Sequence, residues 1–123
     1  MSSNVFTHPG DGLEVFAPTS GSLTATVQTV KASGKGAFYL GHIYNANATV
    51  NYIQVFDVAL ASSITLGTTV ASYTIPIAPS LWDKPLSKPY KFRNGCHIAF
   101  TTTKTGNTAP GTALDAVFGF LAY

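Results

Sequence analysis

At 123 residues with only 10% charged side chains, the chain is long enough for one domain with a hydrophobic core, but it carries far less charge than the roughly 25% of ordinary soluble domains. Its single cysteine, Cys96, excludes an intramolecular disulfide framework and a cysteine-based zinc site within one chain. The net charge of +2 excludes neither acidic nor basic partners.

The surface must be made polar mainly by hydroxyl and amide side chains, because Ser and Thr are abundant. These groups cost less to desolvate than ions, so neighbouring protein subunits can cover such a surface without burying unpaired charges. The composition therefore favours a protein that works inside an assembly. A soluble or secreted domain of the same composition is the alternative.

The first residues, MSSNVFTHPGDGLEVF, lack the basic start and apolar run of a secretory signal. No stretch approaches the roughly 18 apolar residues of a membrane-spanning helix. We therefore expect a chain that is made in a cytoplasm and has no membrane partner. Residues 1–12 form a candidate N-terminal arm, and residues 13–123 form one β-sandwich domain.

Short runs rich in Thr, Val, Ile, Tyr and Phe fill the chain, and no window has the spacing of an amphipathic helix. Turn residues such as Asn94-Gly95 separate these runs. We predict an all-β, single-domain antiparallel β-sandwich of about eight strands. The predicted strands lie near residues 13–17, 22–30, 37–45, 50–59, 70–77, 88–93, 96–103 and 114–123.

The segment 96–103 alternates cleanly between an apolar and a polar face. Cys96, Ile98 and Phe100 share one face, which predicts that Cys96 is a small buried hydrophobe and not a reactive thiol. His97 lies on the opposite face, where we expect it to be exposed. Pro76 and Pro89 indicate edge or bulge positions, because proline cannot donate to a sheet ladder.

The segments 50–59 and 114–123 are apolar on both faces. In the first, Tyr52, Gln54 and Phe56 point one way, while Ile53 and Val55 point the other. This pattern predicts central strands that are covered twice. A sandwich strand has only one inner face, so a long loop, a terminal arm or another subunit must cover the second.

Catalytic or metal-binding groups are few and scattered, so we predict no enzyme, no cofactor and no metal site. The paired histidines of a metal-dependent cupin are absent, and no serine lies in a nucleophile turn. Asp57 is interpreted as an acceptor of backbone N–H groups from the turn that follows it. His42 shares a face with Phe38 and Leu40, so it is either buried or part of an interface. The carboxylates are Asp11, Glu14, Asp57, Asp83 and Asp115, and the histidines are His8, His42 and His97.

The segment LWDKPLSKPYKFRNG, residues 81–95, differs from the rest because basic and aromatic residues alternate in it. Such a segment can bind an acidic protein surface, where Trp, Tyr and Arg are typical anchors. It can also bind nucleic acid, but four cations make a small footprint for that purpose. A solvated loop without a partner is the first alternative to weigh, and of the two binding roles a protein partner is favoured over nucleic acid. The residues predicted to contact a partner are Trp82, Lys84, Lys88, Tyr90, Lys91 and Arg93.

Several short motifs in residues 37–123 resemble a family of small structural proteins of tailed bacteriophages, the capsid decoration or cement proteins. In that family a strand ending in Phe-Asp leads through a Gly-containing loop to a strand ending in Ile-Pro, and a later Phe and Gly introduce a strand that runs into a Ser/Thr triplet. The basic segment and the N-terminal third have no counterpart in the pattern. The matching positions here are Phe56, Asp57, Gly67, Ile75, Pro76, Phe92, Gly95 and Thr101 to Thr103.

The resemblance implies a jelly-roll-like sandwich that decorates and stabilises the exterior of a virion capsid. The expected partner is the major capsid protein, with no nucleic acid, and the protein is expected to form a homo-oligomer, with a trimer favoured. The second apolar strand face would then be the oligomer seam. The predicted seam residues are Tyr52, Gln54, Phe56, Val117 and Leu121.

Two other functions fit the sequence. One is a carbohydrate- or receptor-binding β-sandwich module of a phage tail or fibre, with Trp82 and Tyr90 as a stacking platform. The other is a cupin-type enzyme, which would require at least two histidines to converge.

Overall fold

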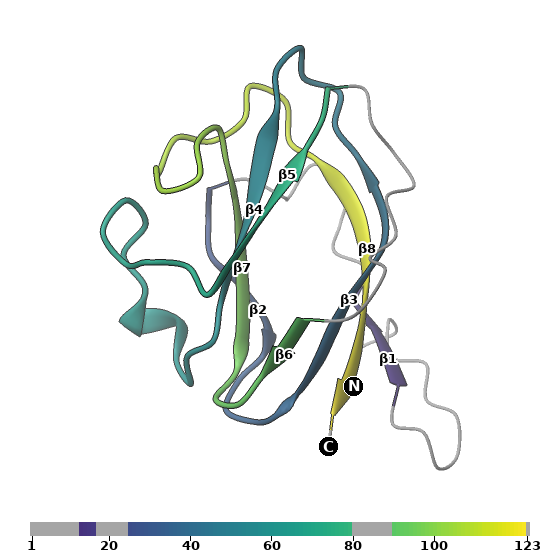
Figure 1. Ribbon diagram of the computed structural model, residues 1–123, viewed down its shortest axis with the longest axis vertical. Helices are drawn as coiled ribbons and strands as arrows, with labels where there is room; N and C mark the ends of the chain where they lie inside the picture. The colour runs from purple at the N-terminus through teal and green to yellow at the C-terminus, as the bar shows by residue number, and fades with distance from the viewer. Residues whose placement is uncertain (1–12, 17–24, 80–89, 123) are drawn as a thin grey trace.

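The computed structural model describes residues 13–16, 25–79 and 90–122. The predictions made for the arm 1–12 and for Trp82, Lys84, Lys88 and Pro89 lie outside these residues. Eight strands and one short 3-10 helix, η1 (Ala61–Ser63), make up the described fold (Figure 1). The strands are β1 (Leu13–Phe16), β2 (Gln28–Lys31), β3 (Gly36–Tyr44), β4 (Asn51–Phe56), β5 (Tyr73–Ile77), β6 (Tyr90–Phe92), β7 (Cys96–Thr101) and β8 (Asp115–Ala122).

The strands form two four-stranded antiparallel sheets with the orders β1-β8-β3-β6 and β2-β7-β4-β5. Apart from β4 and β5, strands that follow each other in the chain lie in different sheets. This is the strand order of a jelly roll, in which two Greek keys close on each other. The prediction of an all-β antiparallel sandwich with jelly-roll character is confirmed, and each predicted segment overlaps one observed strand.

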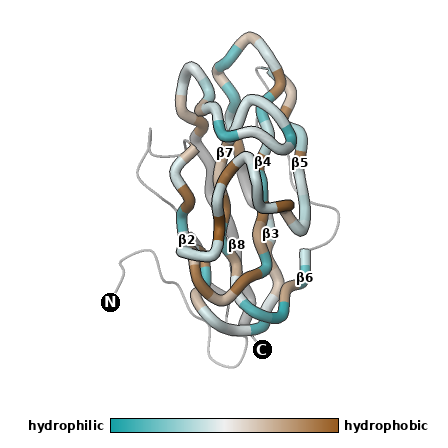
Figure 2. Tube along the Cα trace, turned by 90° about the vertical axis from the view of Figure 1, so that its left-hand side faces the viewer, coloured by the Kyte–Doolittle hydropathy of each residue, from teal (hydrophilic) through white to brown (hydrophobic). Residues whose placement is uncertain are grey.

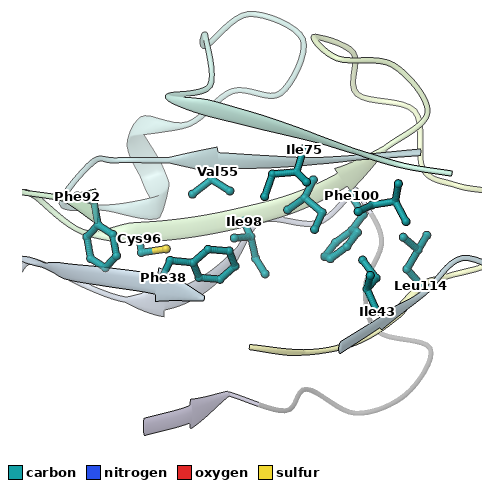
Figure 3. Packing of buried hydrophobic residues seen from close by; sticks show 11 residues of the cluster. Phe38, Ile43, Val55, Ile75, Phe92, Cys96, Ile98, Phe100 and Leu114 are labelled. Carbon is teal, nitrogen blue, oxygen red and sulfur yellow. The ribbon is translucent and has the colours of Figure 1, made fainter. Parts of the chain in front are cut away.

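The core lies between the two sheets, where the inward faces of both meet (Figure 3). Burying each large side chain stabilises the fold by about 1.5–3 kcal/mol. Cys96 belongs to this core, which confirms the prediction of a buried cysteine. The core residues are Phe38, Ile43, Ile53, Val55, Ile75, Ile77, Phe92, Cys96, Ile98, Phe100 and Leu114.

The two strands predicted to be central are central. β4 lies between β7 and β5, and β8 lies between β1 and β3. Pro76 lies in β5, at the edge of its sheet, and is exposed there, as expected for a residue that cannot donate to a ladder. In the described part of the chain no helix is long and apolar enough to cross a membrane.

The second face of β4 is covered by the chain itself. Two long connections, 57–72 between β4 and β5 and 102–114 between β7 and β8, lie on the side of this sheet that faces away from the core (Figures 1 and 2). The Gln54 amide donates to Thr101 Oγ1 at 2.7 Å and to the Gly106 carbonyl at 3.1 Å. Of the three outcomes left open by the strand pattern, a loop cover is the one observed.

This cover corrects the predicted oligomer seam. Gln54 and Phe56 are 0% and 1% exposed within a single chain, so they have no surface to offer to another copy. Tyr52 is half-buried. The side chains of Val117 and Leu121 lie outside what the structure describes.

His97 is also covered, which makes the prediction of an exposed histidine wrong. Its side chain is 1% exposed, and it lies opposite Phe56 in the β4–β7 ladder. One ring nitrogen, Nε2, is 2.9 Å from the Val58 carbonyl, and the other, Nδ1, is 2.9 Å from Thr29 Oγ1. A neutral imidazole that donates from Nε2 and accepts at Nδ1 satisfies both contacts. The polar side chains of β7 are therefore hydrogen-bonded beneath the two loops.

Candidate functional site

The carboxylate of Asp57, directly after β4, binds the turn between β6 and β7. Its oxygens accept the backbone N–H groups of Arg93 at 3.0 and 3.1 Å, of Asn94 at 2.8 Å and of Gly95 at 3.4 Å. The predicted backbone-acceptor role is therefore observed, but the partner turn is a distant one and not the turn that follows Asp57. Hydrogen bonds to an ionised acceptor are stronger than neutral ones, so this turn is firmly held.

The turn between β2 and β3 joins the same end of the sandwich. The Gly34 N–H donates to the Asn94 carbonyl at 2.8 Å, and the two turns lie side by side at the bottom of Figure 1. Ser33 has a positive φ of 53°, which bends the chain sharply before Gly34. The two turns are thus tied together by their backbones.

Four cations gather on these two turns and the adjoining strand ends, and we call this surface the basic end. It consists of Lys31, Lys35, Lys91 and Arg93. Gly36 pairs with Phe92 in the β3–β6 ladder, so Lys35 and Arg93 follow on opposite strands, one residue beyond that pair. Lys35, Lys91 and Arg93 are exposed, and Lys31 is half-buried. Figure 2 shows hydrophilic residues at this end of the molecule.

Asp57 is the one carboxylate whose side chain the structure describes, and it is bound to three backbone groups here. Of the acids in strands whose side chains are not described, Asp115 pairs with Tyr44 at the far end of β3. Glu14 pairs with Phe120, which lies two residues before Ala122, the residue that pairs with Gly36. Among the side chains that the structure describes, four cations and one carboxylate therefore lie at this end, which gives it a net positive charge.

The aromatic residues of the β6 segment are engaged in packing. The rings of Tyr90 and Tyr73 lie 4.4 Å apart between centroids and are tilted by 48°, which is a favourable arrangement for two aromatic rings. The Tyr73 hydroxyl donates to the Lys91 carbonyl at 2.8 Å. Phe92 is in the core. These contacts tie the edges of the two sheets together and leave the basic side chains to the solvent.

The structure thus places three of the predicted contact residues at one end of the molecule. Lys91 and Arg93 are exposed, Tyr90 is half-buried, and Trp82, Lys84 and Lys88 lie outside the described residues. Sequence reasoning missed Lys31 and Lys35. The available signal was a lysine between two glycines, Gly34-Lys35-Gly36, which is typical of an exposed turn.

In the described part of the chain, the one thiol is buried and the possible metal ligands lie apart from one another. Burial, and secondarily the nearby Asp57 carboxylate, raise the pKa of the Cys96 thiol from 9.0 to about 12. The thiolate is the nucleophilic form, so Cys96 is inert at neutral pH. Among the residues that the structure describes, no three His, Cys, Asp or Glu side chains come close enough to hold a metal ion.

A second surface, the charge-free loop of residues 58–72, carries exposed apolar side chains. Leu60 is 59% exposed and Val70 is 84% exposed. The loop is braced by its own hydrogen bonds, including Thr69 N–H to the Thr65 carbonyl at 2.8 Å and Thr65 N–H to Thr69 Oγ1 at 2.9 Å. A hydrogen bond from the Asp57 N–H, just before the loop, to Ser72 Oγ at its last residue joins the two ends at 3.1 Å. The apolar groups are therefore presented on an ordered loop.

Comparison of the chain with protein-family models, curated proteins and solved structures finds no match. The resemblance to phage decoration proteins accordingly depends on the short motifs of the sequence. Those motifs occupy the elements described above: Asp57 holds the turn, Gly95 lies within it, and the Thr triplet begins at the end of β7.

Proposed function

We propose that the protein is a structural component of a tailed-phage virion that decorates and stabilises the capsid through protein–protein contacts. It would act on the capsid exterior after synthesis in the host cytoplasm, as a homo-oligomer with a trimer favoured. The motif resemblance supports the virion assignment. The jelly-roll order supports it as well, because viral capsid domains use this architecture, although lectin domains and cupins do too.

The observation that carries the proposal is the charge-free loop. Large apolar side chains on an ordered, uncharged surface are typical of an interface core, which is depleted in charge. Because the loop is braced, its docking requires little further ordering of the chain. With Gln54 and Phe56 enclosed, Leu60 and Val70 replace them as the residues through which copies would associate.

The sugar-binding alternative is less well supported. It requires an open aromatic platform, and the Tyr90 ring packs on Tyr73 and is half-buried. The other predicted platform residue, Trp82, lies outside the described residues. A glycan array would test this alternative, and specific sugar binding would favour it over decoration.

Rebinding to stripped particles tests the proposal. Virions that carry the protein are stripped of it and mixed with purified protein, and the particles are then pelleted. We expect the protein to return to the capsid and to raise the temperature at which the particles release their DNA. Failure to rebind, or a location on the tail in virion images, would refute decoration.

The solution mass tests the oligomer separately. We expect an oligomer that Leu60→Asp with Val70→Asp dissociates, because a charge would be buried in the contact. The matched control is Thr105→Asp with Ala109→Asp, which adds the same two charges at exposed sites in the β7–β8 connection. A monomeric wild-type protein at high concentration would contradict the oligomer.

A further inference from the structure

The basic end holds four of the five Lys and Arg residues that the structure describes, and the resemblance to decoration proteins does not account for it. Lys35 and Arg93 are exposed on turns that are held by Asp57 and by the Gly34–Asn94 hydrogen bond, and Lys91 is exposed on the adjoining strand β6. Like charges held close together repel each other, and a partner of opposite charge relieves that repulsion. A fixed cluster of this kind fits an anionic ligand.

The choice between a nucleic acid and an acidic protein depends on the aromatic residues. Single-stranded nucleic acids are held by base stacking on exposed rings as well as by phosphate contacts. Here Phe92 is in the core, and the Tyr90 ring is half-buried on Tyr73. The described surface therefore offers cations without a stacking platform, and four cations alone give weak phosphate binding.

Carboxylates match the groups that are present. A guanidinium binds a carboxylate through two parallel N–H donors, and Lys supplies a point charge beside it. Lys35 and Arg93 continue the β3–β6 ladder on opposite strands, so both could face one acidic patch. We infer that the basic end is a docking surface for a carboxylate-rich protein surface. The inference rests on the proposed function in one respect, because it assigns those carboxylates to the capsid subunits.

Binding of a fluorescein-labelled poly-glutamate peptide, followed by anisotropy, tests the inference without capsids. We expect the wild-type protein to bind the peptide at low salt and to release it as NaCl is added, since exposed charges are screened. Lys35→Glu and Arg93→Glu should each weaken binding by about tenfold or more, which corresponds to about 1.4 kcal/mol. Arg93→Lys keeps the charge but loses the paired donors, so its binding should lie between that of the wild type and that of Arg93→Glu.

The matched control is Lys104→Glu, which changes the net charge equally but lies beyond β7 at the opposite end of the sandwich. An equal loss of binding in this variant would show that net charge alone is responsible and would overturn the inference. Tighter binding of a single-stranded oligonucleotide than of poly-glutamate, or no binding of poly-glutamate, would also overturn it. Circular dichroism confirms that each variant is folded.

The particle assay separates this inference from the proposed function. If the protein rebinds stripped particles and the Lys35→Glu and Arg93→Glu variants rebind equally well, decoration stands and the docking role of the basic end is wrong. If poly-glutamate binding has the expected charge dependence but particles are not bound, the basic end stands and decoration is wrong.

Discussion

The carboxylate of Asp57 binds Arg93 through the backbone, with both oxygens 3.0–3.1 Å from the Arg93 nitrogen. The contact connects the end of β4 to the turn after β6 and so fixes the backbone of the residue that carries the cation of that turn. We predict that Asp57→Ala lowers the free energy of unfolding by about 2–4 kcal/mol, because three backbone donors lose a charged acceptor.

Urea unfolding measures this loss, and Asp57→Asn serves as the comparison. The Asn variant keeps one carbonyl oxygen as an acceptor but loses the charge, so its loss should lie between zero and that of the Ala variant. Equal stability of the Ala variant and the wild type would show that the turn does not depend on this carboxylate.

Gly95 lies where two other backbone segments approach the turn. A Cβ at this position would collide with the Val58 carbonyl oxygen and would lie 3.0 Å from the Lys31 carbonyl and 3.1 Å from the Ser33 nitrogen. Because these atoms are backbone and cannot rotate away, we predict that Gly95→Ala destabilises the fold by about 2–3 kcal/mol. Thermal unfolding of purified variants measures the effect.

The control is Gly111→Ala, where the nearest atom to the added Cβ is Asn47 Oδ1 at an ordinary 3.5 Å. Its change should stay within about 0.5 kcal/mol, as at other open surface sites. Similar losses at both glycines would mean that the close approach at Gly95 is not the cause.

The sequence was sufficient to predict the strands and the central positions of β4 and β8, because alternation within one strand reports burial directly. It was not sufficient to predict what covers the outer face of β4. A side-chain pattern shows that a face is buried but does not identify the covering element. The loops 57–72 and 102–114 have no periodic signal of their own, so their position over Gln54 and His97 emerges only from the fold.

The basic end, likewise, could be predicted from the sequence only in part. Lys91 and Arg93 are neighbours in the sequence and are predicted together. Lys35 joins them through the pairing of β3 with β6, and Lys31 joins them through the pairing of β2 with β7. Such pairing is non-local and is set by the order of strands in the sheet, which composition does not encode. For the same reason the turn bound by Asp57 was expected nearby in sequence and is found elsewhere.

Asn45 organises the opposite end of the sandwich. Its amide nitrogen donates to the carbonyls of Thr49, Ile77 and Ala78 at 3.1, 3.0 and 3.3 Å, and its oxygen accepts from Asn47 and Asn51. We predict that Asn45→Ala costs about 2–4 kcal/mol of unfolding free energy, because buried polar groups lose their partners. Asn45→Asp should cost at least as much, since it turns an oxygen toward three carbonyls.

Chemical denaturation of both variants measures these losses. The matched control is Asn94→Ala, at an exposed position whose backbone contacts survive the change, and its effect should be within about 0.5 kcal/mol. An Asn45→Ala protein as stable as the control would contradict a structural role for this network.

The Cys96 thiol makes the stability of the fold sensitive to alkaline pH. Burial, with a smaller contribution from Asp57, raises its pKa from 9.0 to about 12, so the folded protein keeps this proton at pH values where the unfolded chain has lost it. The stabilisation is fully present below about pH 9 and is lost as the pH rises toward 12. Over that interval we predict that this group lowers the free energy of unfolding by up to about 1.4 kcal/mol per pH unit.

Urea unfolding of the wild type and of Cys96→Ala between about pH 8 and pH 10.5 isolates this contribution, because Tyr and Lys titrate in both proteins. We expect the variant to lose stability less steeply with pH, whatever its stability at neutral pH. A native thiol that stays unmodified by a thiol reagent at pH 8 and reacts once urea is added would support the same conclusion. Parallel pH slopes in the two proteins, or rapid modification of the native thiol, would show that the sheets do not shield Cys96.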